Sequence, residues 1–244
     1  DMSAGSGTAT RLDVITIGRC SVDLYGQQIG SRLEDITSFA KSVGGCPSNI
    51  AIGTARLGLR SGLITRVGDE QMGRFVKEQL AREGVCLDGV VTDAERLTAL
   101  VLLAVESDRS FPLIFYRDNC ADSVLSESDI DEDFVRSSAS VLVTGTHFAK
   151  PHTDAAQRKA MRIARANGAK VILDIDYRPN LWGLAGLGAG EERYIKSDKV
   201  SEHMKSILPD CDLIVRPNGE RLAKQILTVF GEIHDFDAPK TTVA

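Results

Sequence analysis

Residues 44–73 read GGCPSNIAIGTARLGLRSGLITRVGDEQMG, and this stretch contains the pattern that decides the fold. Two glycines come first, and apolar residues at helical spacing follow over residues 48–57 until Gly58 ends the pattern. Residues 63–67 then form a short apolar run, which is typical of a buried strand. This order predicts a glycine-rich turn beside the first turn of a helix, where backbone N–H groups are free to bind ligand oxygens.

The start of this helix is the part closest to the expected ligand. Ser48 or Asn49 is expected to cap the helix, and Asn49 is expected to open it and to offer its side-chain amide to ligand oxygens. Gly44 and Gly45 are expected to let the backbone approach the ligand closely. Taken alone, the glycine pair is equally consistent with an ordinary turn in front of a helix.

Strand and helix patterns alternate on both sides of this stretch. Further apolar runs that indicate strands occupy residues 12–17, 140–144, 170–174 and 212–215, and helical spacing occurs over residues 70–83, 153–167 and 200–208. Buried strands that alternate with helices predict an α/β fold with a parallel sheet covered by helices on both faces. Because ligands bind at the carboxyl ends of such strands, the candidate positions are residues 18–23, 67–69, 145–147 and 174–178.

Two segments, residues 24–39 and 98–117, interrupt the alternation because they contain strand-like runs without an intervening helix. Within the second segment, residues 98–105 and 112–116 flank a polar turn and predict a hairpin. The hairpin and the earlier segment are expected to form a small β lid over the site. The expected organisation is a disordered lead at 1–10, an α/β core formed by 11–21, 41–95 and 121–244, and a β lid formed by 22–40 and 96–120.

Composition limits the class of protein. The chain has 244 residues, of which 43% are hydrophobic and 26% charged, so a packed core is expected. The net charge of −5 and the lack of a Lys/Arg block argue against a nucleic-acid partner. No apolar run reaches the roughly 20 residues of a membrane helix, so no membrane partner is expected. The five cysteines are widely spaced without a CxxC pair, which indicates a reducing cytoplasm rather than a disulfide framework or zinc site.

The spacing in residues 44–73 resembles a known family. The matching positions of the family's first signature are Gly44, Gly45, Asn49, Ala51, Gly58 and Gly68, and Val67-Gly68-Asp69 with Gly73 matches its continuation. On these residues the chain resembles the ribokinase-like (PfkB-type) carbohydrate kinases from Leu12 to Val215. The resemblance implies a ribokinase-like parallel sheet flanked by helices with a small β lid, ATP and Mg²⁺ as cofactors, a cytoplasmic location and a homodimer through the lid.

Three further stretches narrow the resemblance to one branch of the family. Residues 18–25 (GRCSVDLY), 115–117 (FYR) and 174–182 (DIDYRPNLW) are similar to the bacterial 5-dehydro-2-deoxygluconokinases of inositol catabolism. The 2-keto-3-deoxygluconate kinases share the YR and YRPxLW elements, and both substrates carry a carboxylate. The resemblance therefore implies ATP-dependent phosphorylation of the primary hydroxyl of a small sugar acid. It favours 5-dehydro-2-deoxygluconate, with 2-keto-3-deoxygluconate or another sugar of the family as the alternative.

Three charged residues carry the expected contacts with the sugar acid. Asp23 can accept hydrogen bonds from two hydroxyls, as the matching residue does in the family, or it can be an ordinary turn or cap residue. Arg117 can form the planar, bidentate pair that carboxylates favour, or it can be a solvated residue at a strand end. Arg178 corresponds to an Arg near substrate or transferred phosphate in the family; the alternative is an ion pair with Asp174 or Asp176.

The complete expected substrate-binding set is Asp23, Gly44, Gly45, Asn49, Tyr116, Arg117, Asp176 and Arg178. Arg178 is also expected as a phosphate contact. His147 follows a strand and either lines the site or is structural. Residues 183–190 (GLAGLGAG) have no GK[ST] ending, so they predict a flexible loop rather than a phosphate-binding loop.

The chain departs from the family after Val215. The GxGD motif, whose Asp is the catalytic base in the family, does not occur in the sequence, and the echo GAGE at residues 188–191 comes in the wrong order. No residue is therefore assigned as the catalytic base, and Glu191 in particular is not. Asn218 is the only residue assigned to the nucleotide. The expectation is a chain without its C-terminal nucleotide-binding part, through a truncated or frameshifted gene, an incompletely represented chain or a natural remnant. A non-catalytic sugar-acid binding protein is the alternative function.

Overall fold

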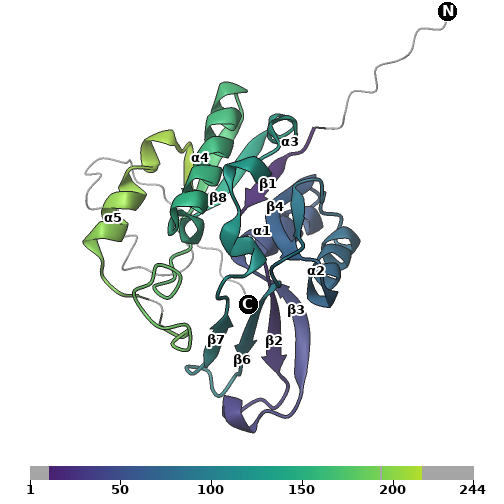
Figure 1. The fold of residues 1–244 in the computed structure, drawn as a ribbon, viewed down its shortest axis with the longest axis vertical. Helices are drawn as coiled ribbons and strands as arrows, with labels where there is room; N and C mark the ends of the chain where they lie inside the picture. The colour runs from purple at the N-terminus through teal and green to yellow at the C-terminus, as the bar shows by residue number, and fades with distance from the viewer. Residues whose placement is uncertain (1–10, 193, 216–244) are drawn as a thin grey trace, which may run out of the picture.

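The computed structural model describes residues 11–192 and 194–215, and in this part of the chain the larger sheet has six strands in the order β10-β9-β8-β1-β4-β5 (Figure 1). All five pairings between neighbouring strands are parallel, as expected from the sequence. The strands are β1 (Val14–Ile17), β4 (Ser61–Gly68), β5 (Val90–Asp93), β8 (Ser140–Thr144), β9 (Lys170–Asp174) and β10 (Leu213–Val215). The sequence pattern did not predict β5, which adds a short edge strand beside β4.

Helices cover both faces of this sheet. They are α1 (Cys46–Arg56), α2 (Gln71–Arg82), α3 (Glu132–Arg136), α4 (Pro151–Ala166) and α5 (Asp198–Lys205). Neighbouring residues of β4 show the two faces, because Leu63 belongs to the same buried cluster as Val76 of α2, whereas Ile64 belongs to the cluster that contains Met161 of α4. Each face therefore has its own hydrophobic core, and the carboxyl ends of the strands are left for the site.

The first helix begins earlier than the sequence predicted. Gly45 is its N-cap with φ +98°, Cys46 is its first residue, and the N–H of Asn49 donates to the carbonyl of Gly45 at 2.9 Å. The expectation that Ser48 or Asn49 caps or opens the helix is therefore wrong. The physical reason is that the positive φ of Gly45 turns the chain directly into the helix, and the fixed φ of Pro47 suits its first turn.

A second sheet has four strands in the order β3-β2-β6-β7 and projects from one end of the core in Figure 1. Its strands are β2 (Ser21–Gly26), β3 (Phe39–Gly44), β6 (Ala99–Leu103) and β7 (Leu113–Tyr116). β6 and β7 are antiparallel, which confirms the predicted hairpin, whereas β2 and β6 are parallel. β3 extends this sheet past the expected boundary at residue 40, as far as the glycine pair.

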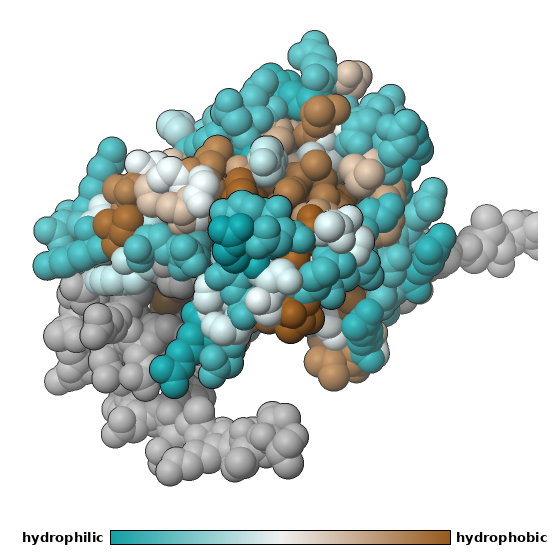
Figure 2. Space-filling model, turned by 90° about the horizontal axis from the view of Figure 1, so that it is seen from below, coloured by the Kyte–Doolittle hydropathy of each residue, from teal (hydrophilic) through white to brown (hydrophobic). Residues whose placement is uncertain are grey.

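The surface at this end of the molecule carries exposed aromatic residues. Figure 2 views this end and shows hydrophilic side chains interspersed with hydrophobic ones. Tyr25 on β2, Phe39 on β3 and Tyr116 on β7 are 42%, 36% and 55% exposed. The second sheet therefore offers aromatic side chains to solvent.

The connections between these elements include short 3₁₀ helices and one glycine-rich loop. The 3₁₀ helices are η1 (Leu33–Asp35), η2 (Ala121–Val124), η3 (Glu127–Asp129), η4 (Gly145–Phe148) and η5 (Leu208–Asp210). The glycine-rich loop of residues 183–190 lies along the edge of β7, where the N–H of Phe115 donates to the carbonyl of Leu187 and the N–H of Gly190 donates to that of Leu113, both at 3.0 Å. Asn180 secures this loop from the core side, because its side-chain N–H groups donate to the carbonyls of Gly186 and Ala189.

Within residues 11–192 and 194–215, none of the helices combines the length and the hydrophobicity needed to cross a membrane. The lead expected at residues 1–10 and the nucleotide residue Asn218 lie outside the described residues.

Candidate functional site

The glycine pair makes room for an acid and for the backbone of the segment between β1 and β2. A Cβ on Gly44 would overlap the carboxylate of Asp23, and a Cβ on Gly45 would overlap the carbonyl oxygen of Arg19. The sequence analysis attributed the two glycines to close approach of a ligand. In the structure Gly44 leaves room for the carboxylate of Asp23, which lies on the adjacent strand β2, and Gly45 leaves room for the carbonyl of Arg19. The geometry thus links the glycine pair to the predicted hydroxyl-binding acid.

Asp23 lies partly buried at the base of the second sheet. Ser21 donates its hydroxyl to Oδ1 of Asp23 at 2.8 Å. Burial raises the pKa of the Asp23 carboxyl, while the Ser21 hydrogen bond and the charges of Arg19 and Arg117 oppose that rise. Since these two arginines influence Asp23, the acid and both cations belong to one electrostatic cluster.

A buried ion pair joins β1 and β9 at their carboxyl ends. Arg19 donates from Nε and Nη2 to Oδ2 of Asp176 at 3.1 and 3.0 Å, and Thr146 donates to the same oxygen at 3.3 Å. Nε of Arg178 lies 3.8 Å from Oδ1 of Asp176. The structure therefore shows the ion pair with Asp176, which was one of the two interpretations of Arg178. The contact of Arg178 with substrate or phosphate stays a prediction.

Asp174 and Cys46 form a second contact at the same strand ends. The thiol of Cys46 donates to Oδ2 of Asp174 at 2.7 Å, and the N–H of Asp176 donates to Oδ1 of Asp174 at 3.2 Å. Burial raises the pKa of the Cys46 thiol, and the nearby charges of Asp176 and Asp174 raise it further. Cys46 is therefore a neutral hydrogen-bond donor rather than a thiolate nucleophile.

Arg117 lies where the second sheet joins the core. It is buried and forms an ion pair with Asp122, which is completely buried as well. Oδ2 of Asp122 also accepts the backbone N–H of Cys20 at 3.0 Å, so one carboxylate ties together the chain segments that lead into β2 and out of β7. In the described residues, Nη1 of Arg117 and Oδ1 of Asp122 have no hydrogen-bond partner. The alternative that Arg117 is a solvated strand-end residue is therefore wrong.

His147 belongs to the same buried cluster. Its Nε2 lies 3.1 Å from the backbone carbonyl of Asp122, and burial lowers the pKa of the imidazole to about 4. The structural role that the sequence analysis allowed for His147 fits this position, because a neutral imidazole can donate one hydrogen bond to the carbonyl.

The structure brings most, but not all, of the predicted site residues together. Arg178 faces Asp176 at the strand ends, Arg117 pairs with Asp122 at the junction of the sheets, and Asp23 lies beside Gly44 where the charges of Arg19 and Arg117 act on it. Asn49 is exposed in the first turns of α1, and Tyr116 is exposed on the edge strand β7. Their roles in substrate binding remain predictions.

Sequence reasoning did not single out two central residues, Arg19 and Asp122. Arg19 lies in the stretch at residues 18–25 that carries the resemblance, which was the only available signal. Asp122 lies in no motif, and its contact with Cys20 spans 102 positions of the chain. Both residues act through burial and pairing, and neither property is visible in a linear pattern.

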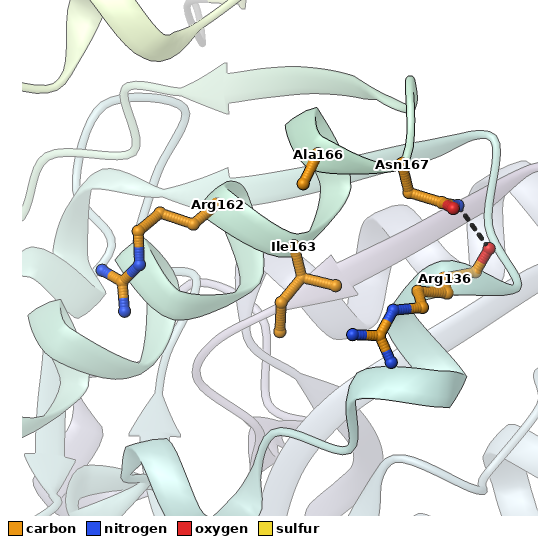
Figure 3. Close-up of a pocket in the computed structure, with 5 residues that line it drawn as sticks. All are labelled: Arg136, Arg162, Ile163, Ala166 and Asn167. Carbon is orange, nitrogen blue, oxygen red and sulfur yellow. Dashed lines mark hydrogen bonds between the residues drawn. The ribbon is translucent and has the colours of Figure 1, made fainter.

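A separate surface hollow of about 300 Å³ lies at the C-terminal ends of α3 and α4, near the start of β9 rather than at the carboxyl ends of the strands (Figure 3). It is lined by Arg136, Arg162, Ile163, Ala166 and Asn167. Both arginines already have acidic partners, since Arg136 pairs with Glu132 at 2.6 Å and Arg162 pairs with Glu127 at 3.3 Å. The hollow therefore offers no unpaired cation to an anionic ligand.

The described residues contain no cluster of side chains that could hold a metal ion by itself. Over residues 11–192 and 194–215, no three His, Cys, Asp or Glu side chains come together in a way that could hold a metal ion. The acids at the strand ends instead pair with arginines or with the Cys46 thiol. Residues that would hold Mg²⁺ and ATP are accordingly assigned to none of the described positions.

The fold and the signature at its centre define a ribokinase-like protein, and comparison with known families agrees. The model of the pfkB family carbohydrate kinases matches residues 11–185. The chain therefore belongs to the pfkB family of carbohydrate kinases. A protein named 5-dehydro-2-deoxygluconokinase from Geobacillus kaustophilus is 38% identical over 214 residues, which cover 86% of this chain and 62% of the relative. The protein of the same name from Geobacillus thermodenitrificans is 37% identical over 231 residues, covering 94% of this chain and 64% of the relative.

Solved structures show the same fold. The PfkB protein from Polaromonas sp. JS666 superposes with a TM-score of 0.74 at 31% identity, covering 83% of this chain and 65% of that one. A putative ribokinase II from E. coli, solved with ATP and Mg²⁺, gives a TM-score of 0.75 at 21% identity, covering 90% of this chain and 68% of that one. The chain spans less than two thirds of the length of the two curated Geobacillus relatives.

Proposed function

We propose that this chain provides the sugar-acid site of a kinase that phosphorylates the primary hydroxyl of a small sugar acid, with 5-dehydro-2-deoxygluconate of inositol catabolism as the favoured substrate. The observation that carries the proposal is that Arg178, 23% exposed, faces Asp176 after β9 at only 3.8 Å, while the partly buried Asp23 lies beside Gly44 within the electrostatic influence of Arg19 and Arg117. A carboxylate suits sugar hydroxyls, and guanidinium groups suit the carboxylate of a sugar acid. The relatives named 5-dehydro-2-deoxygluconokinase support this choice of substrate.

Each residue has a defined part in the proposed site. Asp23 accepts hydrogen bonds from hydroxyls of the substrate and thereby orients the chain of the sugar. Arg117 and Arg178 neutralise the substrate carboxylate, and the missing side chain at Gly44 leaves the space that the Asp23 carboxylate occupies. Because burial raises the pKa of Asp23, hydroxyl binding by its ionised form weakens as the pH falls.

ATP and Mg²⁺ are part of the proposal through family membership. ATP would supply the phosphoryl group, and Mg²⁺ would neutralise charge on its phosphates. No catalytic base is assigned to a described residue, and the assignment of Asn218 to the nucleotide stays a prediction outside them. A cytoplasmic location fits the five cysteines, all of which are free thiols.

The proposal is tested by titration calorimetry with 5-dehydro-2-deoxygluconate, 2-keto-3-deoxygluconate and the neutral sugar fructose. Wild-type protein is expected to bind a sugar acid more tightly than fructose by about tenfold or more, because a charge-assisted pair forms only with the acid. Arg178→Met, which changes a partly exposed side chain, is expected to remove most of this preference. Equal affinity for the acids and for fructose would refute a sugar-acid site.

A second candidate function is sugar-acid binding without phosphoryl transfer. It is favoured by one observation, the lack of a GxGD motif in the 244 residues. An ATP-coupled assay on protein of verified mass separates the two functions. A phosphorylated product supports the kinase, whereas tight binding of the acid without any product supports the binding protein.

We also propose a homodimer in which the second sheets of two copies face each other. The exposed aromatic residues Tyr25, Phe39 and Tyr116 support this arrangement, because paired sheets would remove them from water. Light scattering after size exclusion is expected to give twice the chain mass of 26.4 kDa, and Tyr25→Ser with Phe39→Ser is expected to shift it toward the monomer.

A further inference from the structure

In the part of the chain that the structure describes, the side-chain hydrogen bonds to the Asp176 carboxylate all go to one of its two oxygens, Oδ2. Its Oδ2 accepts Nε and Nη2 of Arg19 at 3.1 and 3.0 Å and the hydroxyl of Thr146 at 3.3 Å. The side chains of Arg19 and Asp176 are only 8% and 6% exposed. Both charges are thus removed from water and compensate each other, as buried charges must.

The other oxygen of Asp176 faces Arg178 across a longer gap. Nε of Arg178 lies 3.8 Å from Oδ1, which is beyond the range of an N–H···O hydrogen bond. The Arg178 side chain keeps 23% of its surface exposed, in contrast to that of Arg19. Arg178 is therefore held near Asp176 without being bonded to it, and among the described residues no other acid forms an ion pair with it, so its N–H groups can meet another anion.

Within the described part of the chain, the remaining groups around Asp176 provide no further cation. Asp174 accepts the N–H of Asp176 at 3.2 Å, and the Cys46 thiol next to it stays protonated because burial raises its pKa. Among the described residues, the ion-pair partners of Asp176 are Arg19 and Arg178. If Arg19 were uncharged, Arg178 would be the cation left to neutralise a buried carboxylate.

We propose that Arg19 is a positioning residue that keeps Asp176 neutralised and thereby leaves Arg178 free to bind the carboxylate of the sugar acid. The inference rests on the proposed function and deepens it. It also changes the expected role of Asp176, which here controls Arg178 instead of contacting the substrate. Arg19 and Arg178 thus have different tasks although both face the same acid.

The affinity test uses Arg19→Gln, Arg178→Met and the double variant Arg19→Gln/Asp176→Asn, with 5-dehydro-2-deoxygluconate as the probe in calorimetry. Arg19→Gln is expected to weaken binding about tenfold, because the uncompensated Asp176 draws Arg178 into a close pair. The double variant is expected to regain most of this loss, since the neutral amide that replaces the carboxylate no longer attracts Arg178. Because the double variant also removes an uncompensated buried charge, the position of Arg178 in the crystal structure described below separates positioning from a merely structural role.

The matched control is Arg56→Gln, which removes an arginine from an exposed ion pair with Glu83 and is expected to leave binding unchanged. Wild-type affinity in Arg19→Gln, or a double variant that binds as weakly as Arg19→Gln, would overturn the inference. Arg19→Lys replaces the glutamine variant if the latter does not fold. Its single ammonium holds Asp176 less firmly, so a smaller loss is expected, again reversed by Asp176→Asn.

A second measurement does not depend on the sugar. In a crystal structure of Arg19→Gln, Arg178 is expected to move from 3.8 Å to hydrogen-bond distance of Asp176, about 2.8–3.0 Å. An unchanged separation would overturn the inference even if the sugar acid binds. Conversely, a wild-type protein that binds no sugar acid would refute the proposed function, while this movement of Arg178 would still support the role of Arg19.

Discussion

Arg19 and Arg117 are both buried and both face a carboxylate, yet their surroundings differ. Arg19 shares Asp176 with Thr146 at the strand ends of the core, and the second oxygen of that acid faces Arg178. Arg117 pairs with Asp122 at the junction of the two sheets, where Nη1 of the arginine and Oδ1 of the acid lack partners within the described residues. The first pair lies between elements of one sheet, whereas the second connects two sheets and keeps unused hydrogen-bonding capacity.

This difference separates two kinds of contribution. A buried pair joined by two hydrogen bonds mainly fixes its neighbours, while buried atoms without a partner are costly unless water or a ligand satisfies them. We therefore expect the Arg117 pair to matter more for joining the second sheet to the core and the Arg19 pair to matter more for controlling Arg178. Substitutions at and around the two pairs test this distinction. They are described from the largest expected effect to the smallest.

Asp122→Ala is expected to give the largest loss of stability, about 3–5 kcal/mol in the free energy of unfolding. The change leaves the Arg117 cation buried without a counter-charge and the N–H of Cys20 without its acceptor. Urea denaturation followed by circular dichroism measures the loss. Asp13→Ala is the control, because its ion pair with Arg60 is exposed and should contribute far less. Similar losses in the two variants would show that Asp122 does not hold the sheets together.

The His147 imidazole is expected to make the junction sensitive to acid. Burial lowers its pKa from 6.5 to about 4, so the unfolded chain takes up a proton that the folded chain refuses. Stability from this group is complete above pH 6.5 and is lost as the pH falls toward 4, by about 3 kcal/mol in total. The groups that influence this histidine are Asp122, Arg117 and Arg19.

The measurement compares urea denaturation of wild type and His147→Gln between pH 7.5 and pH 4. Carboxylates titrate in both proteins, so the difference between the two curves isolates the imidazole. The free energy of unfolding of the wild type is expected to fall more steeply than that of the variant below about pH 6.5. Parallel curves would mean that His147 is protonated as easily in the folded chain as in the unfolded chain.

Gly190→Ala is expected to loosen the edge strand that leads to Arg117. A Cβ at this position would overlap the carbonyl of Leu113 and displace the glycine-rich loop from β7, at a cost of about 1–3 kcal/mol. Hydrogen exchange of the Phe115 amide, which donates to Leu187, is expected to accelerate. Gly188→Ala is the matched control, because no atom lies within 4 Å of a Cβ there. Equal protection in both variants would show that the loop does not support β7.

The sequence predicted the core sheet well because its strands are continuous apolar runs. Residues 140–144 and 170–174 are strands in the structure with the predicted bounds. β5 was missed because Val90–Asp93 is only four residues long and partly polar. The start of α1 was missed because the positive φ of Gly45, rather than a capping side chain, sets it. Local patterns thus predict strands better than they predict the turns between them.

The site was predictable only in part, for a related reason. Strand ends could be located by pattern, which led to Asp23, Asp176 and Arg178. The residues that pair with these charges could not be located by pattern. Arg19 and Asp176 are 157 positions apart, and Asp122 lies in no motif. Burial, which turns an ordinary Arg–Asp contact into a constraint, appears only when the chain is folded.

Thr146→Val is expected to give the smallest effect and to test how completely Arg19 controls Asp176. The change removes one hydrogen bond of 3.3 Å to Oδ2 at nearly constant volume, so the free energy of unfolding should fall by about 1 kcal/mol. Binding of 5-dehydro-2-deoxygluconate should stay within about threefold of wild type, because the two bonds from Arg19 still neutralise the acid. Denaturation and calorimetry on the same preparation check both values. A tenfold loss of affinity in this variant would show that the Thr146 hydroxyl controls Asp176 as much as the Arg19 guanidinium does. The proposed difference in role between the Arg19 pair and the Arg117 pair would then be lost.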